Sequence, residues 1–145
     1  MEYATEFEKT FVDDDWERLA KYFPDDIVYE VRGGPMACRI EGRDAMFRGI
    51  RKSLDGLDRR FENRDIELVE GPSVRDVQEG EEIRIGWRIK YSRANCPPVI
   101  LPGGSVFVVS GDQIVAMRDE YQDEELTEMQ RWMEEYGADI DGSYV

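Results

Sequence analysis

The segment "EEIRIGWRIKY", residues 81–91, carries the clearest pattern in the chain. Apolar side chains fall on every second residue, and charged ones lie between them. The apolar set is Ile83, Ile85, Trp87, Ile89 and Tyr91, and the basic set is Arg84, Arg88 and Lys90. Side chains two residues apart share one face of a β-strand, so the pattern predicts a strand with one buried face and one face in water. Such a strand needs a sheet beside it and a second layer over its apolar face.

Neighbouring segments supply the rest of that sheet. The other strand-like segments of the second half, separated by Gly-containing turns, are residues 59–71, 73–80, 104–111 and 112–122. The sequence "VSGDQI", residues 109–114, is a hairpin turn signal. One earlier strand is expected at "DIVYEVR", residues 26–32. The apolar, proline-rich stretch "ANCPPVILPGG", residues 94–104, is interpreted as a lip over the sheet rather than a linker.

Helical periodicity marks the remaining parts of the chain. The helical segments are residues 7–23, 41–56 and 123–137. Asp14 and Glu17 have the spacing of a capping box, which predicts a second helix from Trp16, and Asp123 is expected to cap the last helix. Helices segregated from a run of antiparallel strands indicate an α+β fold, with the N-terminal helices covering the sheet. We expect one domain over residues 1–137 and a loose tail over residues 138–145.

The charge balance excludes several classes of partner. The chain has 33 acidic and 19 basic residues and a net charge of -14. Nucleic-acid binding depends on Lys and Arg that neutralise phosphates, so neither nucleic acid nor an anionic membrane surface is an expected partner. No apolar run reaches the length of a membrane span. The acidic N-terminus lacks the features of a signal peptide, so the expected location is the cytoplasm.

Residue types narrow the chemistry further. The chain has no histidine and two widely separated cysteines, Cys38 and Cys96. A Ser-His-Asp triad, a histidine-ligated zinc site and a four-cysteine site are therefore excluded. Nucleotide-binding glycine motifs are absent as well. We expect no cofactor and no metal, and acids and bases must come from Asp, Glu, Tyr, Lys or Cys.

The acidic, lysine-poor composition has two readings that the sequence leaves open. Proteins of salt-loving microbes have such surfaces, whose self-repulsion is relieved when salt screens it. The alternative is an acidic bacterial protein with no special salt requirement.

Four segments together resemble a known family. They are "DDDWERLAKYFPDDIVYE" (13–30), "IEGRDAMFRGI" (40–50), "PPVILPGG" (97–104) and "DQIVAMRDEYQD" (112–123). Their order and spacing resemble the SnoaL-like members of the nuclear transport factor 2-like superfamily, over about Phe7 to Tyr136. The resemblance implies a cone, in which a strongly curved antiparallel sheet wraps over helices around an apolar pocket. The superfamily includes cyclases, isomerases, hydrolases and proteins with no catalytic activity, so it implies no single reaction.

Two enzyme types within this superfamily do not fit residue by residue. Ketosteroid isomerases need an aspartate base, a tyrosine and a protonated aspartate. The matching positions here are Val31, Phe7 and a residue near Pro102, so the functional groups of that site are missing. Limonene-epoxide hydrolase is similar at "MRD", residues 117–119, but its paired arginine and aspartate on a neighbouring strand have no complete counterpart. Polyketide cyclases, which similarly use a carboxylate near the end of the last strand, stay compatible.

The candidate site centres on Asp119. On a strand, Val115, Met117, Asp119 and Tyr121 share one face, and the resemblance places that face in the pocket. Burial there would disfavour the charged form of Asp119 and raise its pKa, as suits a proton acceptor or donor. We therefore expect Asp119 and Tyr121 to be catalytic. The expected ligand-binding residues are Tyr29, Val31, Trp87, Tyr91 and Met117.

Two functions of different classes follow. The first is a small-molecule protein whose apolar pocket takes a small apolar organic molecule, as a cofactor-independent lyase, isomerase, cyclase or hydrolase with Asp119 as acid or base. The second is a non-catalytic ligand-binding or interaction module with a filled or inert pocket. The resemblance also implies a homodimer formed through the outer face of the sheet, where Phe107, Ile114 and Ala116 are expected to lie.

Overall fold

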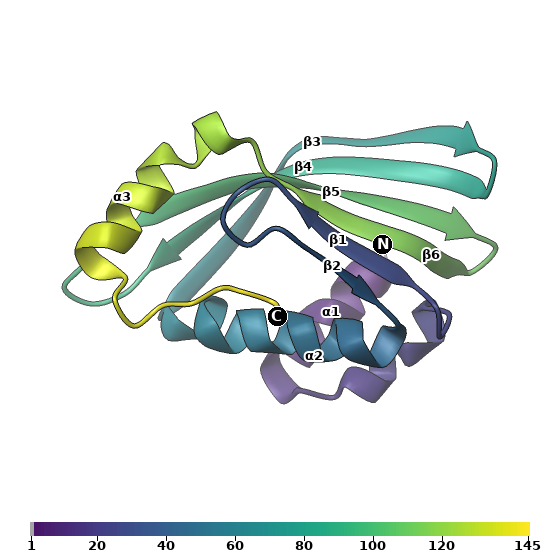
Figure 1. The fold of residues 1–145 in the computed structure, drawn as a ribbon, viewed down its shortest axis with the longest axis horizontal. Helices are drawn as coiled ribbons and strands as arrows, with labels where there is room; N and C mark the ends of the chain where they lie inside the picture. The colour runs from purple at the N-terminus through teal and green to yellow at the C-terminus, as the bar shows by residue number, and fades with distance from the viewer. Residues whose placement is uncertain (1) are drawn as a thin grey trace.

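The computed structural model describes residues 2–145 (Figure 1). Its α-helices are α1 (Glu2–Asp13), α2 (Arg43–Gly56) and α3 (Thr127–Tyr136). Short 3-10 helices are η1 (Trp16–Tyr22), η2 (Asp58–Arg60) and η3 (Asp123–Glu125). The strands are β1 (Val28–Arg32), β2 (Cys38–Glu41), β3 (Asn63–Val77), β4 (Gly80–Ser92), β5 (Val99–Ser110) and β6 (Gln113–Glu120). The expected α+β fold is confirmed.

The strands form one six-stranded sheet in the order β2-β1-β6-β5-β4-β3. Neighbouring strands are antiparallel except β1 and β6, which run parallel, so the sheet is mixed rather than purely antiparallel. This parallel pair places the first half of the chain directly beside its last strand. Residues 28–32 of β1 therefore lie beside residues 116–120 of β6, and the two segments run in the same direction.

The sheet bends sharply near its middle, where β3, β4 and β5 change direction (Figure 1). A bulge in β3 shifts its register against β4 around Gly71, whose φ of 82° is a conformation that favours glycine. On β5, Gly103 lies opposite Trp87, and a Cβ on Gly103 would come within 2.6 Å of the Trp87 ring. The missing side chain lets the Trp87 ring lie against β5 on the inner face of the bend.

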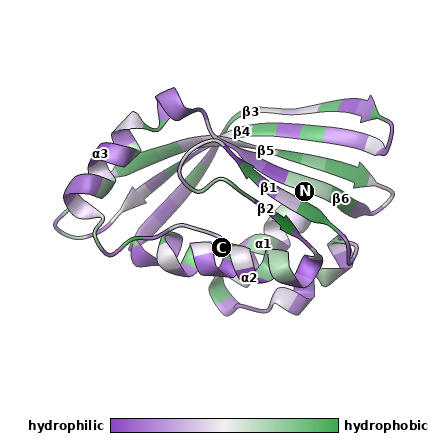
Figure 2. Cartoon of the chain, viewed as in Figure 1, coloured by the Kyte–Doolittle hydropathy of each residue, from purple (hydrophilic) through white to green (hydrophobic). Residues whose placement is uncertain are grey.

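The core lies between the inner face of the sheet and the helices. Figure 2 shows hydrophobic and hydrophilic residues alternating along the strands, as expected for a sheet with one covered face. The largest fully buried side chains include Leu19, Phe23, Ile27, Tyr29, Met46 and Tyr91. Deep burial of Leu19, Phe23 and Met46 shows that the N-terminal helices supply the covering layer, as the sequence predicts.

The predicted lip is wrong for most of its length. Val99–Pro102 belongs to β5 and pairs with β4, so Val99 lies opposite Tyr91 and Leu101 opposite Ile89. Both Val99 and Leu101 are buried. The three prolines of the segment favoured a loop, because proline has no backbone N–H to donate to a neighbouring strand. In the structure, the alternation of apolar residues prevails and the segment forms a strand.

Both predicted helix caps are also wrong. Asp14 has a φ of 57°, and its carboxylate accepts hydrogen bonds from the indole of Trp16 and the guanidinium of Arg59 instead of a helix amide. Asp123 Oδ1 accepts a hydrogen bond from the Gly34 backbone amide at 2.9 Å, and α3 begins at Thr127 without a side-chain cap. Each carboxylate has found a tertiary donor that the local sequence does not reveal.

A bulge changes which residues of β6 face inward. The pairing of β5 and β6 slips between Val108 and Val109, so Ile114 and Met117 both lie on the inner face. Ile114 and Phe107 are buried in the core, and neither belongs to the outer face where a dimer contact was expected. A single extra residue in one strand reverses the alternation beyond it.

The C-terminal segment, residues 138–145, has no helix or strand. It nevertheless differs from the expected loose tail, because it packs along α2. The Ser53 hydroxyl donates a hydrogen bond to the Gly142 carbonyl at 2.6 Å, and Tyr144 packs against the core. The segment thus closes part of the cone.

Candidate functional site

Asp119 lies on the inner face of β6 between two strands. It pairs with Val31 of β1 on one side and with Ser105 of β5 on the other. Tyr29, two residues before Val31 on β1, projects from the same inner face. The parallel pairing of β1 with β6 and the antiparallel pairing of β5 with β6 therefore bring three segments, far apart in sequence, around one carboxylate.

Both oxygens of the Asp119 carboxylate accept hydrogen bonds from hydroxyl groups. The Tyr29 hydroxyl donates to Oδ2 at 2.5 Å, and the Ser105 hydroxyl donates to Oδ1 at 2.6 Å. Within residues 2–145, no Lys or Arg forms an ion pair with Asp119. The neighbouring Glu120, by contrast, is paired with Arg84 and Arg118 on the opposite face of the strand. Asp119 is thus held by neutral donors.

The indole of Trp87 fixes the direction of this hydrogen-bond chain. Trp87 Nε1 donates to the Ser105 Oγ at 2.9 Å. An indole nitrogen is a donor only, so the Ser105 hydroxyl must direct its own proton elsewhere, toward Asp119. Each hydrogen bond in the series from Trp87 through Ser105 to Asp119 is therefore donated toward Asp119. This arrangement favours the ionised form of the Asp119 carboxylate, which accepts hydrogen bonds.

Some neighbours of Asp119 raise its pKa, and others lower it. Burial raises the pKa of the carboxyl above its ordinary value, the hydrogen bonds from Ser105 and Tyr29 lower it, and the charge of Glu120 raises it, with a net increase. Burial, followed by the charge of Asp119, raises the pKa of Tyr29 well above 10. Tyr29 stays a neutral donor at physiological pH, and Asp119 is a better base than an exposed aspartate.

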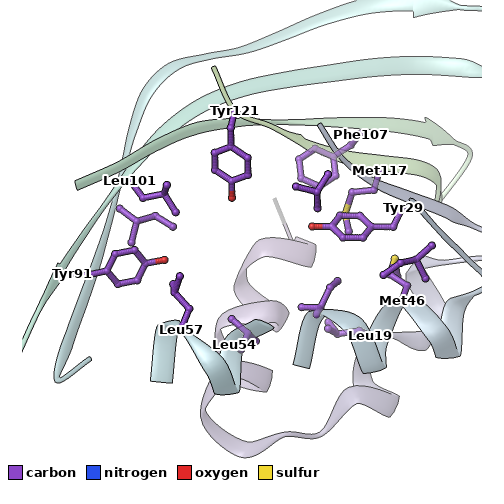
Figure 3. Packing of buried hydrophobic residues seen from close by; sticks show 14 of the residues in the cluster. Leu19, Tyr29, Met46, Leu54, Leu57, Tyr91, Leu101, Phe107, Met117 and Tyr121 are labelled. Carbon is purple, nitrogen blue, oxygen red and sulfur yellow. The ribbon is translucent and has the colours of Figure 1, made fainter. Parts of the chain in front are cut away.

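The structure places the other expected residues around the same interior with different partners. Figure 3 shows the hydroxyls of Tyr29, Tyr91 and Tyr121 directed into one interior region. The Tyr121 ring packs edge-on against Trp87, with centroids 5.8 Å apart. Tyr91 donates a hydrogen bond to Asp58 Oδ2 at 3.0 Å and so belongs to a separate polar cluster.

The remaining two expected ligand contacts, Val31 and Met117, are buried on the inner face. The Tyr3 hydroxyl approaches the Met117 sulfur at 3.9 Å. Met117 is therefore partly covered by α1, and both side chains contribute apolar lining beside Asp119.

Sequence reasoning missed Ser105 and Tyr144. Ser105 reads as one small residue of a strand, and its importance comes from the β5–β6 register, which the sequence does not specify. Tyr144 follows the last helix in a segment with no periodic pattern. An aromatic residue in an otherwise polar terminus, "DGSYV", was the one available signal.

Two hollows reach residues that adjoin Asp119 without including Asp119 itself. A cavity of about 300 Å³ opens at the sheet bend and is lined by the charged residues Arg84, Arg88 and Glu120 and also by Trp87, whose indole donates to Ser105. A hollow of about 50 Å³ lies between β1, β5 and β6 and is lined by Val28, Val106, Val108, Ala116 and the expected ligand contact Met117 among others. Tyr29, Met117 and Tyr121, which surround Asp119, are buried.

Residues 2–145 were also compared with the requirements of a metal site and of a membrane-spanning helix. No group of three or more His, Cys, Asp or Glu side chains in this part of the chain is arranged to hold a metal ion. Among the helices it contains, none combines the length and apolarity of a membrane span.

The bent sheet, the helices beneath it and the carboxylate near the end of the last strand define an α+β cone protein. Residues 4–117 match the SnoaL-like domain family. The chain belongs to this family. A search of curated proteins found no match to this chain in sequence.

Solved structures share the fold at low sequence identity. A candidate polyketide cyclase from Xanthomonas campestris is 20% identical, with a TM-score of 0.54 and coverage of 91% of this chain and 92% of its own. A nuclear transport factor 2-like protein of unknown function from Burkholderia pseudomallei is 15% identical, with a TM-score of 0.60 and coverage of 87% and 92%. TerC, co-crystallised with polyporic acid, is 12% identical, with a TM-score of 0.59 and coverage of 92% and 96%.

Proposed function

We propose that this SnoaL-like protein binds a small organic molecule inside the cone and catalyses a cofactor-independent proton transfer with Asp119 as the acid–base group. The observation that carries the proposal is the state of Asp119: a partly buried carboxylate with two hydroxyl donors and no arginine or lysine partner in residues 2–145. A carboxylate with a structural role alone is usually paired with a cation when it is removed from water.

The reaction class follows from these groups. Asp119 accepts a proton from an activated carbon or a hydroxyl of the substrate, and the electron pair left behind moves onto a substrate oxygen. Tyr121, whose hydroxyl points into the same interior (Figure 3), donates a hydrogen bond to that oxygen. Protonated Asp119 then returns the proton to the product, which restores the carboxylate. Val31, Trp87 and Met117 supply apolar contacts to the substrate.

Structural relatives support a small-molecule role. One resembles this chain in fold and is a candidate polyketide cyclase. Another was co-crystallised with polyporic acid. At these identities the relatives share the fold, so the particular reaction rests on Asp119 and its neighbours.

The test measures proton exchange at an activated carbon. Acetylacetone in deuterated buffer reports removal of a proton between two carbonyls, read by NMR as loss of the methylene signal above the buffer rate. Asp119→Asn keeps the size of the side chain and removes the base, so exchange should fall by on the order of 10²–10⁴-fold. Asp112→Asn, on the exposed turn between β5 and β6, is the matched control and should exchange at the wild-type rate. Equal rates in wild type and Asp119→Asn would contradict acid–base catalysis.

A second candidate function, the non-catalytic module, is favoured by the filling of the interior. Tyr29, Tyr91 and Tyr121 are buried, and neither of the two hollows is lined by any of them. On this alternative, neither wild type nor any variant accelerates exchange, and Asp119→Asn changes stability alone.

A further inference from the structure

The last eight residues form a strap over the open side of the cone. This C-terminal strap, residues 138–145, leaves α3 and returns along α2, as Figure 1 shows for the yellow end of the chain. The Asp141 amide donates a hydrogen bond to the Gly56 carbonyl at 3.0 Å. The Ser53 hydroxyl donates to the Gly142 carbonyl at 2.6 Å. The strap therefore has defined contacts with two successive turns of α2.

The surface of α2 beneath the strap is formed by small residues. Gly49, Ser53 and Gly56 are spaced four and three residues apart and so share one helical face. A Cβ on Gly56 would lie 1.8 Å from the Asp141 carbonyl oxygen, and one on Gly49 would lie 3.0 Å from the Tyr144 carbonyl oxygen. Larger side chains at these positions would displace the strap from its seat.

Docking of the strap brings the ring of Tyr144 into the interior beside the candidate site. The ring centroids of Tyr144 and Tyr29 are 5.7 Å apart. Burial and the charge of Asp119 raise the pKa of the Tyr144 hydroxyl, and the hydroxyls of Tyr29 and Ser53 lower it. The Tyr144 ring thus packs against Tyr29, whose hydroxyl is the hydrogen-bond donor to Asp119.

The hydrogen-bonding groups around Tyr29 indicate which kind of ligand would fit the position that Tyr144 occupies. The Tyr29 hydroxyl uses its proton on Asp119 and keeps lone pairs that accept a hydrogen bond from a neighbouring hydroxyl. A phenol suits this position, because its ring packs against the Tyr29 ring as that of Tyr144 does, and its hydroxyl has a proton to donate to the Tyr29 oxygen. The chain's own terminus presents such a phenol.

We propose that Tyr144 occupies the ligand position as an internal substitute, and that the interior takes a phenolic compound when the strap is displaced. This inference deepens the proposed function and rests on it, since it names the ligand class and the element that controls entry. The strap competes with the ligand, so apparent affinity is reduced by the fraction of molecules in which the strap is docked.

The experiment replaces the internal phenol with a free one. The Tyr144→Ala variant lacks the ring, and 4-methylphenol has the structure of the missing side chain. Isothermal titration calorimetry should detect binding of 4-methylphenol to Tyr144→Ala, and the wild type should bind at least about tenfold more weakly because the strap occupies the site. Toluene, which has the ring and lacks the hydroxyl, should bind the variant about tenfold more weakly than 4-methylphenol, as expected for the loss of one buried hydrogen bond.

Three results would overturn the proposal: no binding of 4-methylphenol by Tyr144→Ala, equal affinity for toluene, or equal affinity in the wild type. A chain that ends at Ser143 removes the ring by a second route if the first variant misfolds. Tyr136→Ala, on α3, is the matched control and should not bind 4-methylphenol. The outcome is separable from the exchange assay, because binding without exchange contradicts the proposed catalysis alone, and exchange without phenol binding contradicts this inference alone.

Discussion

At the scale of single residues, Ser105 links the aromatic wall of the site to its carboxylate. It accepts from Trp87 and donates to Asp119, so Ser105→Ala leaves the indole without its partner and removes one donor from Asp119. We expect a loss of about 1–3 kcal/mol in the free energy of unfolding, measured by urea titration, because a partly buried donor is left unsatisfied. Ser110→Ala, at the exposed end of β5, is the control and should be nearly neutral. An equally small effect at both positions would show that the chain of hydrogen bonds contributes little.

Asp119 should also give folding stability a particular dependence on pH. Its pKa is raised in the folded state, chiefly by burial, so the folded protein keeps this proton at a pH where the unfolded chain has lost it. The contribution of Asp119 to stability is therefore fully present below the ordinary aspartate pKa and falls as pH rises through the raised value. Asparagine does not titrate, so the stability of wild type relative to Asp119→Asn should decrease as pH rises from about 4.

Urea unfolding of wild type and Asp119→Asn over a series of pH values measures this difference. Asp112→Asn removes one exposed negative charge and controls for the change in net charge. A difference between wild type and Asp119→Asn that stays constant over the whole series would show that burial does not change the proton affinity of Asp119 in the folded protein.

At the scale of elements, the spacing of apolar residues along the chain predicted the helices and strands that depend on local interactions. The alternation in residues 81–91 identified β4 and its buried face, and helical periodicity located α2 and α3. Features that depend on contacts with distant segments could not be predicted from this spacing. The bulge that turns Ile114 inward, the pairing of Val99–Pro102 with β4, and the donor that Gly34 offers to Asp123 each require knowledge of a strand or loop distant in sequence. Asp119 was placed through a family resemblance, and Ser105 was missed because its role comes from register.

The fit between α2 and the strap can be tested at this scale without altering the strap itself. Gly56→Ala raises helix propensity, by about 1 kcal/mol on peptide scales, yet places a Cβ 1.8 Å from the Asp141 carbonyl oxygen. We expect the helix to remain and the strap to leave α2. Carboxypeptidase should then release the C-terminal residues several-fold faster than from wild type, because proteolysis follows the population of the undocked state. Arg48→Ala, on an exposed position of α2, is the control, and equal release from both variants would contradict a close fit.

At the scale of the whole molecule, the expected homodimer needs a different surface from the one first predicted. Phe107 and Ile114 lie in the core, so they are unavailable for the outer face. Four exposed large apolar side chains gather on the edge strand β3: Ile66, Leu68, Val69 and Val74, with Val74 at 57%. Edge strands with exposed apolar side chains favour association, so we expect the contact here. Light scattering should give a dimer for wild type and a monomer for Val74→Lys, whereas Val12→Lys, equally apolar and 83% exposed on α1, should stay dimeric. A monomeric wild type would contradict the prediction.

The net charge of -14 leads to the last prediction, which concerns salt. Exposed carboxylates repel one another in the compact state, and raising the ionic strength from about 0.01 M to 1 M shortens the Debye length from about 30 Å to 3 Å. Screening also weakens surface ion pairs such as Arg18–Asp13, but exposed pairs contribute only about 0–1 kcal/mol each, so relief of the net repulsion should prevail. Melting temperature should therefore rise with sodium chloride, by about 2–4 °C for each kcal/mol gained in a domain near this size. Sulfate is avoided, because it stabilises folded proteins by exclusion from their surfaces whatever their charge. A flat or falling curve in chloride would favour an acidic protein adapted to ordinary salt, in which ion pairs and repulsion already balance.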